Sequence, residues 1–385
     1  MLYILERYRL APRNPDDSHR AATPLELFFD LISVIAIASV TAGLHHAISE
    51  GHGLEALPRF LFLFTAIWWA WMNFTWFASA FDNDGPLYRL LVMVIMTGEL
   101  IFAGGAGYIF ETLDMSWGIA GWCIMRIGMA ALWFRAAGNP EYRETCIRYG
   151  IGILIAQLGW VAMYFLVPPG SSMFFVAGTL VFLLEFSVPP FAESKGVTPF
   201  HRHHMIERYG LLTIISLGEI MLSISHGFGM LFGEHANFAS ASTALAAVVI
   251  VFTLFWIYFC LEEHLRSREF MPVFIWGYTH VFIFGGIAAL GAAISAELDL
   301  AAHHSEANPD DIAIWLGASL AVILVALWVA RDRNHALGTR QLALPVMAVV
   351  SLIGAWIGLS TWGFAIIAAI ALIWRVRLSE PQSAH

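Results

Sequence analysis

Charged residues are scarce in this chain. Asp, Glu, Lys and Arg make up 13% of its 385 residues, whereas hydrophobic residues make up 59%. A soluble chain of this length cannot bury so much apolar surface in one core, but helices in a bilayer need not hide it from lipid. The composition therefore excludes an ordinary soluble globular protein, and nothing in the charge pattern supports nucleic-acid binding.

Several residue types and motifs are also missing. The three cysteines are far apart, so neither a disulfide framework nor a cysteine metal site is predicted. The only lysine, Lys195, lies between apolar stretches, which excludes a retinal Schiff base inside a helix bundle. H-E-x-x-H, G-x-S-x-G and P-loop motifs are absent, so the sequence predicts no cofactor and does not favour an enzyme. The first residues lack the apolar run of a cleavable signal peptide.

Apolar stretches fill most of the chain instead. A helix needs about 20 apolar residues to cross a bilayer, and twelve stretches are candidates. Their approximate ranges are 24–46, 57–81, 87–110, 115–137, 144–167, 172–193, 204–228, 239–262, 270–295, 311–331, 340–357 and 359–376. The predicted fold is an all-α membrane protein of about twelve transmembrane helices.

Positive charge alternates from one connection to the next. Of the 20 Lys and Arg residues, 18 lie in the two tails and in every second connection, the opposite connections carry only Arg59, and Arg126 lies within a span. Positive charge collects on the cytoplasmic side, so we expect a multi-pass protein of the bacterial inner membrane with both termini inside. Eleven helices would result if 340–376 formed a hairpin, but Arg375 and Arg377 favour twelve.

Sequence similarities between the two halves suggest an internal duplication. Glu26 and His45 recur as Glu207 and His226, at the same offset of 181 residues. The pattern F-T-x-x-W begins at Phe64 and again at residue 252. Six helices per half would preserve orientation, which predicts parallel repeats over residues 1–195 and 196–385, with a site between them at mid-depth. Chance similarity among apolar helices is the alternative.

Four ionisable residues inside the predicted spans are candidates for a functional role. Glu99, Glu219 and His280 are near mid-depth, and Asp30 is about two turns into the first span. Such residues usually face the bundle interior, where they pair with another charge or handle ions. Asp30, Glu99, Glu219 and His280 are therefore the candidates for binding protons or cations. A surplus carboxyl group is either protonated, because desolvation raises its pKa, or faces water.

A second group of charged residues has a structural explanation. Arg126 lies in the fourth span and can neutralise only one acid, which makes it an internal counter-ion. Glu26 follows Thr23 and Pro24 in a capping-box pattern, so its carboxylate has a local role. Asp30 follows one turn later and is within reach of Arg20 or Arg208. The candidates for a structural charge network are Glu26, Arg126, Glu185, Glu207 and Arg208.

For the clusters of histidine and tryptophan, a structural role is favoured over ligand binding. His201, His203 and His204 precede Glu207, and a metal site there is less favoured than a solvated helix start facing lipid headgroups. No metal site is predicted. Trp68, Trp69, Trp71 and Trp76 lie in the second span, where packing is favoured over a substrate-stacking role.

Two segments resemble the signature of a known family. Residues 24–31, Pro-Leu-Glu-Leu-Phe-Phe-Asp-Leu, and 207–211, Glu-Arg-Tyr-Gly-Leu, with Leu-Gly-Glu at 217–219, are similar to the bacterial low temperature requirement A family. The resemblance implies a polytopic inner-membrane protein connected with growth in the cold, and assigns no biochemical activity. It marks Glu26, Asp30, Glu207, Arg208 and Glu219 as the polar residues of the motif.

Three kinds of function fit these observations. A proton- or cation-coupled transporter using midplane carboxylates is the favoured interpretation. An ion channel of duplicated six-helix build and a non-transporting membrane sensor or scaffold are the alternatives, and an enzyme acting on lipid remains open. The expected partners are membrane lipids, protons or small cations and an unidentified substrate, and a homo-oligomer is compatible with the sequence.

Overall fold

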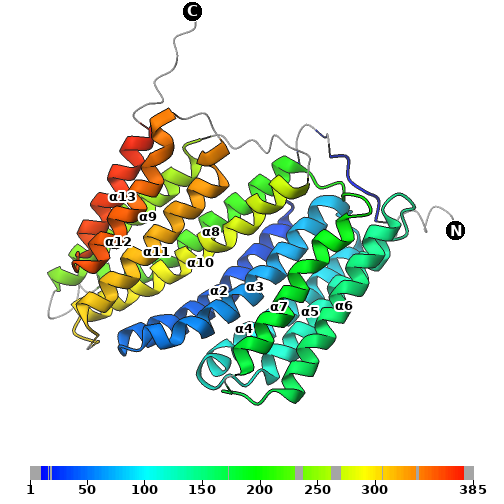
Figure 1. Ribbon diagram of the computed structural model, residues 1–385, viewed down its shortest axis with the longest axis horizontal. Helices are drawn as coiled ribbons and strands as arrows, with labels where there is room; N and C mark the ends of the chain where they lie inside the picture. Colours follow the sequence, from blue (N-terminus) through cyan, green and yellow to red (C-terminus); the bar gives the residue numbers. More distant parts are fainter. Residues whose placement is uncertain are drawn as a thin grey trace, which may run out of the picture. The chain divides into compact units, whose positions relative to one another are not determined.

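The computed structural model describes residues 10–15, 17, 20–171, 173–229, 237–261, 270–305, 307–334 and 338–376. In these ranges the chain forms twelve α-helices, two short 3-10 helices and no strand, which confirms the predicted all-α fold (Figure 1). Eleven helical segments are long and apolar enough to cross a membrane, and the last helix is shorter. The protein is therefore a multi-pass helical membrane protein.

The helices follow the predicted spans closely. Their bounds are α2 Pro24–Ser49, α3 Gly53–Phe81, α4 Pro86–Thr112, α5 Ser116–Ala136, α6 Arg143–Leu166, α7 Met173–Glu193, α8 Arg202–Gly229, α9 Phe238–Phe259, α10 Phe270–Ala301, α11 Pro309–Ala330, α12 Ala343–Trp356 and α13 Thr361–Val376. The 3-10 helices are η1 Asp332–Asn334 and η2 Gly338–Leu342. Backbone polar groups find no water inside a bilayer, so long apolar segments must satisfy them internally as helices.

Local signals set several helix starts. Asn308 caps α11 by accepting a hydrogen bond from the backbone N–H of Asp310, with Pro309 in the first turn. Asn237 caps α9 in the same way, accepting from Ser240. Proline in the first turn costs nothing because its missing N–H has no helical partner there. Polar capping residues therefore mark these helix starts.

The chain divides into two compact units that are described separately. Unit 1 comprises Met1–Val40 and Pro58–Leu212, and unit 2 comprises Thr41–Leu57 and Thr213–His385. In unit 1, α4 packs against α5, α5 against α6 and α6 against α7, and α3 is the most deeply buried span. In unit 2, α10, α11 and α12 pack in sequence while α13 packs against α9. The repeat with a boundary at 195/196 stays a prediction.

Two glycines allow close contact between α4 and α5. A Cβ atom at Gly121 would lie 2.5 Å from the Gly98 carbonyl oxygen, and one at Gly98 would lie 2.5 Å from the Gly121 carbonyl oxygen. Small residues let membrane helices approach until their backbones touch. The α4–α5 pair therefore depends on the absence of side chains at these two positions.

We expect Gly121→Ala to lower the free energy of unfolding by about 1–3 kcal/mol, the usual cost of overpacking. Gly104→Ala on α4 is the matched control, because a Cβ atom there meets nothing within 4 Å. That control should be neutral or stabilising by about 0.5–1 kcal/mol, since alanine favours helix over glycine. Thermal unfolding in detergent measures both, and equal stability of the two variants would contradict the close α4–α5 contact.

The side of the membrane that each end faces stays a prediction. It depends on basic residues, of which Arg7, Arg9, Arg266, Arg268 and Arg377 lie outside the described residues. Successive helices of unit 1 run in opposite directions, so one end of the unit holds the starts of α2, α4, α6 and α8 and the ends of α3, α5 and α7. Arg13 and Arg20 lie at this end, which we call the α2-start end of unit 1.

Candidate functional site

A group of buried charges occupies the α2-start end of unit 1. It begins with the capping box at the start of α2, where the backbone N–H of Thr23 donates to Glu26 Oε2 at 2.7 Å and the backbone N–H of Glu26 donates to Thr23 Oγ1 at 3.3 Å. The same Glu26 side chain is fully buried. A capping residue is usually near solvent, so Glu26 has a further role inside the unit.

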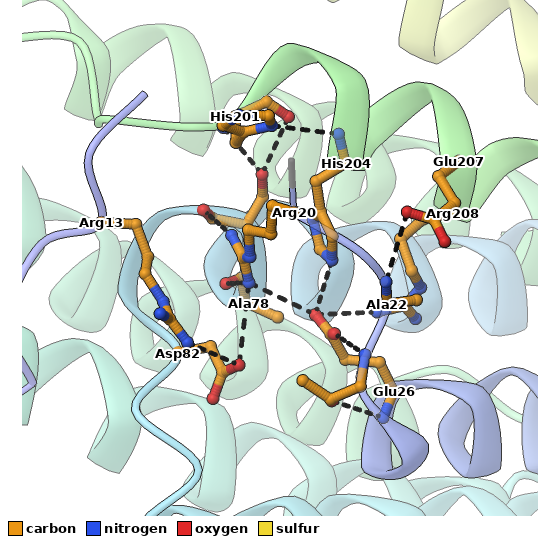
Figure 2. Close-up of polar contacts among 12 residues, drawn as sticks. Arg13, Arg20, Ala22, Glu26, Ala78, Asp82, His201, His204, Glu207 and Arg208 are labelled. Atoms are coloured by element: carbon orange, nitrogen blue, oxygen red, sulfur yellow. Dashed lines mark hydrogen bonds and ion pairs between the residues drawn. The ribbon is translucent and has the colours of Figure 1, made fainter. Parts of the chain in front are cut away.

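The other oxygen of Glu26 meets three basic side chains (Figure 2). Glu26 Oε1 lies 3.0 Å from His204 Nε2, 3.2 Å from Arg208 Nη1 and 3.6 Å from Arg20 Nη2. His204 and Arg208 come from the first turns of α8, and Arg20 comes from the segment before α2. Glu26 therefore joins α2, α8 and the N-terminal segment.

Asp30 lies one turn further along α2 and binds Arg208. Arg208 donates from Nη2 to Asp30 Oδ1 at 2.6 Å and from Nε to Oδ2 at 3.2 Å. The Trp71 indole N–H donates to Asp30 Oδ1 at 2.6 Å. All three side chains are fully buried. The bidentate geometry is that of a strong Arg–carboxylate pair, and it connects α2 to α8 while Trp71 adds α3.

The N-terminal segment completes the group. Arg13 Nη2 lies 3.3 Å from Asp82 Oδ2, and Arg20 donates to the backbone carbonyls of Ala78 and Ser79 near the end of α3. Burial and the nearby Glu26 raise the pKa of Asp82, while burial lowers the pKa of Arg20. Arg20 Nη2 also lies 3.8 Å from Asp82 Oδ2. The segment is thus tied to the end of α3 by charge and by backbone contacts.

These side chains form what we call the Glu26 cluster. Its fixed charges balance, because three acids face three arginines. The six members are Glu26, Asp30, Asp82, Arg13, Arg20 and Arg208, with His204 as a seventh, titratable member. The structural candidate Glu207 lies at its edge, where Glu207 Oε2 accepts from the Ala22 backbone N–H at 3.2 Å.

Glu99 on α4 lies next to this cluster but has no basic partner. Its side chain is fully buried, and no basic side chain among the described residues pairs with either carboxyl oxygen. Its polar neighbours are the Ser33 hydroxyl and the Asp30 carboxylate. An ionised carboxylate is costly to bury without a partner, so Glu99 must bind a proton or a cation, or move, whenever it would otherwise be charged.

A second buried ion pair lies deeper in unit 1. Arg126 Nη2 is 3.1 Å from Glu185 Oε1 and joins α5 to α7. The indole N–H groups of Trp69 and Trp160 donate to Glu185 at 2.8 Å and 3.2 Å. The Arg126 guanidinium also lies over the Trp122 ring, 5.4 Å from its centroid. Four helices therefore meet at this ion pair, in which the Glu185 carboxylate accepts two indole hydrogen bonds and lies beside one arginine.

The two candidates in unit 2 have different surroundings. His280 is fully buried, and its ring contacts the Trp276 carbonyl at 2.8 Å through Nδ1 and the Tyr258 hydroxyl at 3.2 Å through Nε2. A neutral imidazole satisfies both contacts. Glu219 is half-buried, with no hydrogen bond or ion pair to another described residue. His280 therefore has the contacts of a packed core histidine, whereas Glu219 has none that define a role.

The histidines before Glu207 correct one expectation from the sequence. His203 is exposed, but His201 and His204 are buried, so the expected solvated helix start is wrong for these two. The residues at the start of α8 contact the N-terminal segment. His201, directly before the helix, lies with its Nε2 2.7 Å from the Asp17 carbonyl oxygen. Within the described ranges, no group of three or more His, Cys, Asp or Glu residues is arranged to hold a metal ion.

Sequence reasoning did not assign several members of the Glu26 cluster. Asp82 was not among the candidates from the sequence, and the tryptophans were predicted to serve packing. Asp82 is instead 2% exposed and pairs with Arg13, and Trp69 and Trp71 donate to buried carboxylates. The only available signal for Trp71 was its depth, because an indole N–H at mid-membrane needs an acceptor.

The fold and its buried charges define a class, that of polytopic helical membrane proteins with charge clusters inside the bundle. The family model of the bacterial low temperature requirement A protein matches residues 21–376, so the chain belongs to this family. An uncharacterized protein of Rhizobium meliloti (strain 1021) is 25% identical over 337 residues, which covers 83% of this chain and 80% of that protein. No solved structure matches the chain.

Proposed function

We propose that this protein is a proton-coupled transporter of the bacterial inner membrane and that Glu99 carries the coupling proton. The observation that supports it is the environment of Glu99, a fully buried carboxyl group without a basic partner among the described residues, near Asp30 of the Asp30–Arg208 ion pair. Intramembrane carboxylates of this kind are the usual material of proton relays.

The chemistry of Glu99 favours a proton over a metal cation. A proton neutralises a carboxyl group without any further ligand, whereas a small cation in a protein takes about six oxygen ligands or more. The described neighbourhood of Glu99 offers Ser33 and Asp30, and Asp30 already binds Arg208 and Trp71. Protonated Glu99 fits the site as it stands, and loss of its proton creates a charge that must be compensated by movement or by water.

The Asp30–Arg208 pair provides a mechanism for coupling. When Glu99 loses its proton, its negative charge lies beside Asp30 and competes for Arg208. Arg208 lies in the second turn of α8, and Asp30 lies on α2, so a change of partner alters the force between these two helices. Coupled transport results when this change accompanies the alternate opening of a substrate site to the two sides of the membrane. We place the α2-start end on the cytoplasmic side, because positive charge collects there.

Proton flux in proteoliposomes, followed with an internal pH dye, tests the proposal. The wild type is compared with Glu99→Gln, which keeps size and polarity but cannot ionise. Glu111→Gln is the matched control, because Glu111 is an exposed residue of the same helix. We expect Glu99→Gln to lower the flux by about 100-fold, the contribution of one positioned proton-transfer group, and Glu111→Gln to leave it unchanged.

Elution as a single species and an unchanged unfolding temperature show that Glu99→Gln is folded. Wild-type flux in a folded Glu99→Gln variant would refute the proposal. Single-channel currents in a planar bilayer would favour the ion-channel alternative, because slow and saturable exchange is what a transporter produces. Absence of flux from the wild type under every imposed gradient would favour a sensor or scaffold.

A further inference from the structure

The environment of His204 distinguishes it from the other histidines. Its side chain is fully buried in the first turn of α8, and its Nε2 lies 3.0 Å from Glu26 Oε1. Its second ring nitrogen, Nδ1, has no hydrogen-bond partner among the described residues. The backbone N–H of His204 donates to His201 Nδ1 at 3.2 Å. One nitrogen is thus held by a carboxylate, and the other is available to bind a proton.

Charged and titratable groups reach His204 from every element packed around it. Glu26 lies on α2, Arg20 belongs to the N-terminal segment, and Arg208 follows one turn later on α8. One contact further away are Asp30, bound to Arg208, and Asp82, near Arg20. The buried Tyr88 of α4 and His201, which directly precedes α8, are also part of this environment.

The charge balance of the Glu26 cluster restricts where a proton can go. Its three acids and three arginines sum to zero, so a neutral His204 and a protonated Glu99 leave the cluster and Glu99 without net charge, with Arg13, whose side chain is 39% exposed, as its outermost member. Charging either of these two groups alone puts a net charge into a buried site, which is unfavourable. Loss of a proton from Glu99 together with gain of one at His204 keeps the sum at zero.

We infer that His204 is a second proton-binding site of unit 1, which takes up a proton when Glu99 releases one. This inference rests on the proposed function. In the exchange, the O–H bond of Glu99 breaks and an N–H bond forms at His204 Nδ1, while Nε2 keeps its hydrogen atom toward Glu26. The Glu26 carboxylate stabilises the imidazolium, and Arg208, which contacts both Glu26 and Asp30, connects the two sites.

The pH dependence of flux tests this inference. His204→Gln keeps an amide N–H that can donate to Glu26 but cannot titrate, and His203→Gln is the control because His203 is its exposed neighbour. An imidazole changes charge as the pH changes, whereas a glutamine does not. We expect wild type and His203→Gln to show the same pH step. His204→Gln should lose the step and about tenfold or more of the flux.

A direct measurement keeps the inference testable if His204→Gln does not fold. Nitrogen-15 NMR of histidine-labelled wild-type protein in nanodiscs reports the protonation of His204, with His204→Gln or, failing that, His204→Asn used to assign its signal. The titration midpoint should shift in Glu99→Gln, since the two protons are coupled. A His204 whose protonation does not change with pH, or a midpoint unchanged in Glu99→Gln, would overturn the inference.

The outcomes separate the two proposals. Normal flux and a normal pH step in His204→Gln, together with loss of flux in Glu99→Gln, would reject the role of His204 and leave the role of Glu99 intact. Full flux in Glu99→Gln would reject the proposed function itself, whatever His204 does. Loss of flux in Glu99→Gln and loss of the pH step in His204→Gln would support both.

Discussion

Replacing Arg208 with methionine is expected to lower the free energy of unfolding by about 3–5 kcal/mol, because it leaves buried carboxylates without their main counter-ion. Arg208 contacts Asp30 through two hydrogen bonds and Glu26 at 3.2 Å, and all three side chains are fully buried. After the substitution, Asp30 keeps the Trp71 N–H, which cannot neutralise its charge. Thermal and chemical unfolding in detergent measure the loss.

Two further variants establish that the loss comes from uncompensated charge. The triple variant Glu26→Gln, Asp30→Asn, Arg208→Met removes the two carboxylates together with the arginine and should recover much of the lost stability. Arg143→Met is the control, because Arg143 is exposed at the start of α6, and a surface substitution usually changes stability by less than about 0.5 kcal/mol. Equal stability of Arg208→Met and Arg143→Met would show that the Asp30–Arg208 pair is not formed.

The second large effect is expected at the Arg126–Glu185 pair, where the two single substitutions should differ. Glu185→Leu leaves Arg126 buried with no carboxylate and removes the acceptor of the Trp160 N–H. We expect it to cost about 3–5 kcal/mol. Arg126→Met should cost less, because Glu185 retains the indole donors of Trp69 and Trp160.

A double-mutant cycle measures this pair. The double variant Arg126→Met, Glu185→Leu should be more stable than Glu185→Leu alone, since a matched apolar pair leaves no buried charge without a partner. Unfolding temperatures of the four proteins give the coupling energy. Additive losses would show that the two side chains do not interact, and the pair would then not hold α5 and α7 together.

Much of the fold could be predicted from the sequence because the bilayer allows few alternatives. Twelve apolar stretches predicted twelve helices, and the start of α2 was predicted to the residue from Thr23, Pro24 and Glu26. These features depend on neighbours in sequence, through apolar length and through capping. The division into two structural units could not be predicted from the sequence. The boundary between the units falls inside α2, between Val40 and Thr41, where the apolar stretch continues without interruption.

The candidate site could be predicted only in part. The sequence placed Asp30 and Glu99 inside the membrane and offered Arg20 or Arg208 as a partner for Asp30. The structure places Arg208 on Asp30 and Arg20 against Glu26. It also brings in Asp82, which was not a candidate from the sequence, and His204, for which a solvated helix start was predicted. Asp82 pairs with Arg13 of the N-terminal segment at the end of α3, and His204 pairs with Glu26.

The sequence by itself determined the elements and the depth of each polar side chain, because both follow from apolar length and from a rise of about 1.5 Å per residue. Only the tertiary structure decided which of these side chains meet. Arg208 and Asp30 are 178 positions apart, and Trp69 and Glu185 are 116 apart. Helical periodicity determines which face of a helix a residue occupies, but the partner helix at that face depends on packing. The same holds for Glu99: its position on α4 is given by the sequence, but the packing of the helices leaves no basic side chain of the described residues beside it.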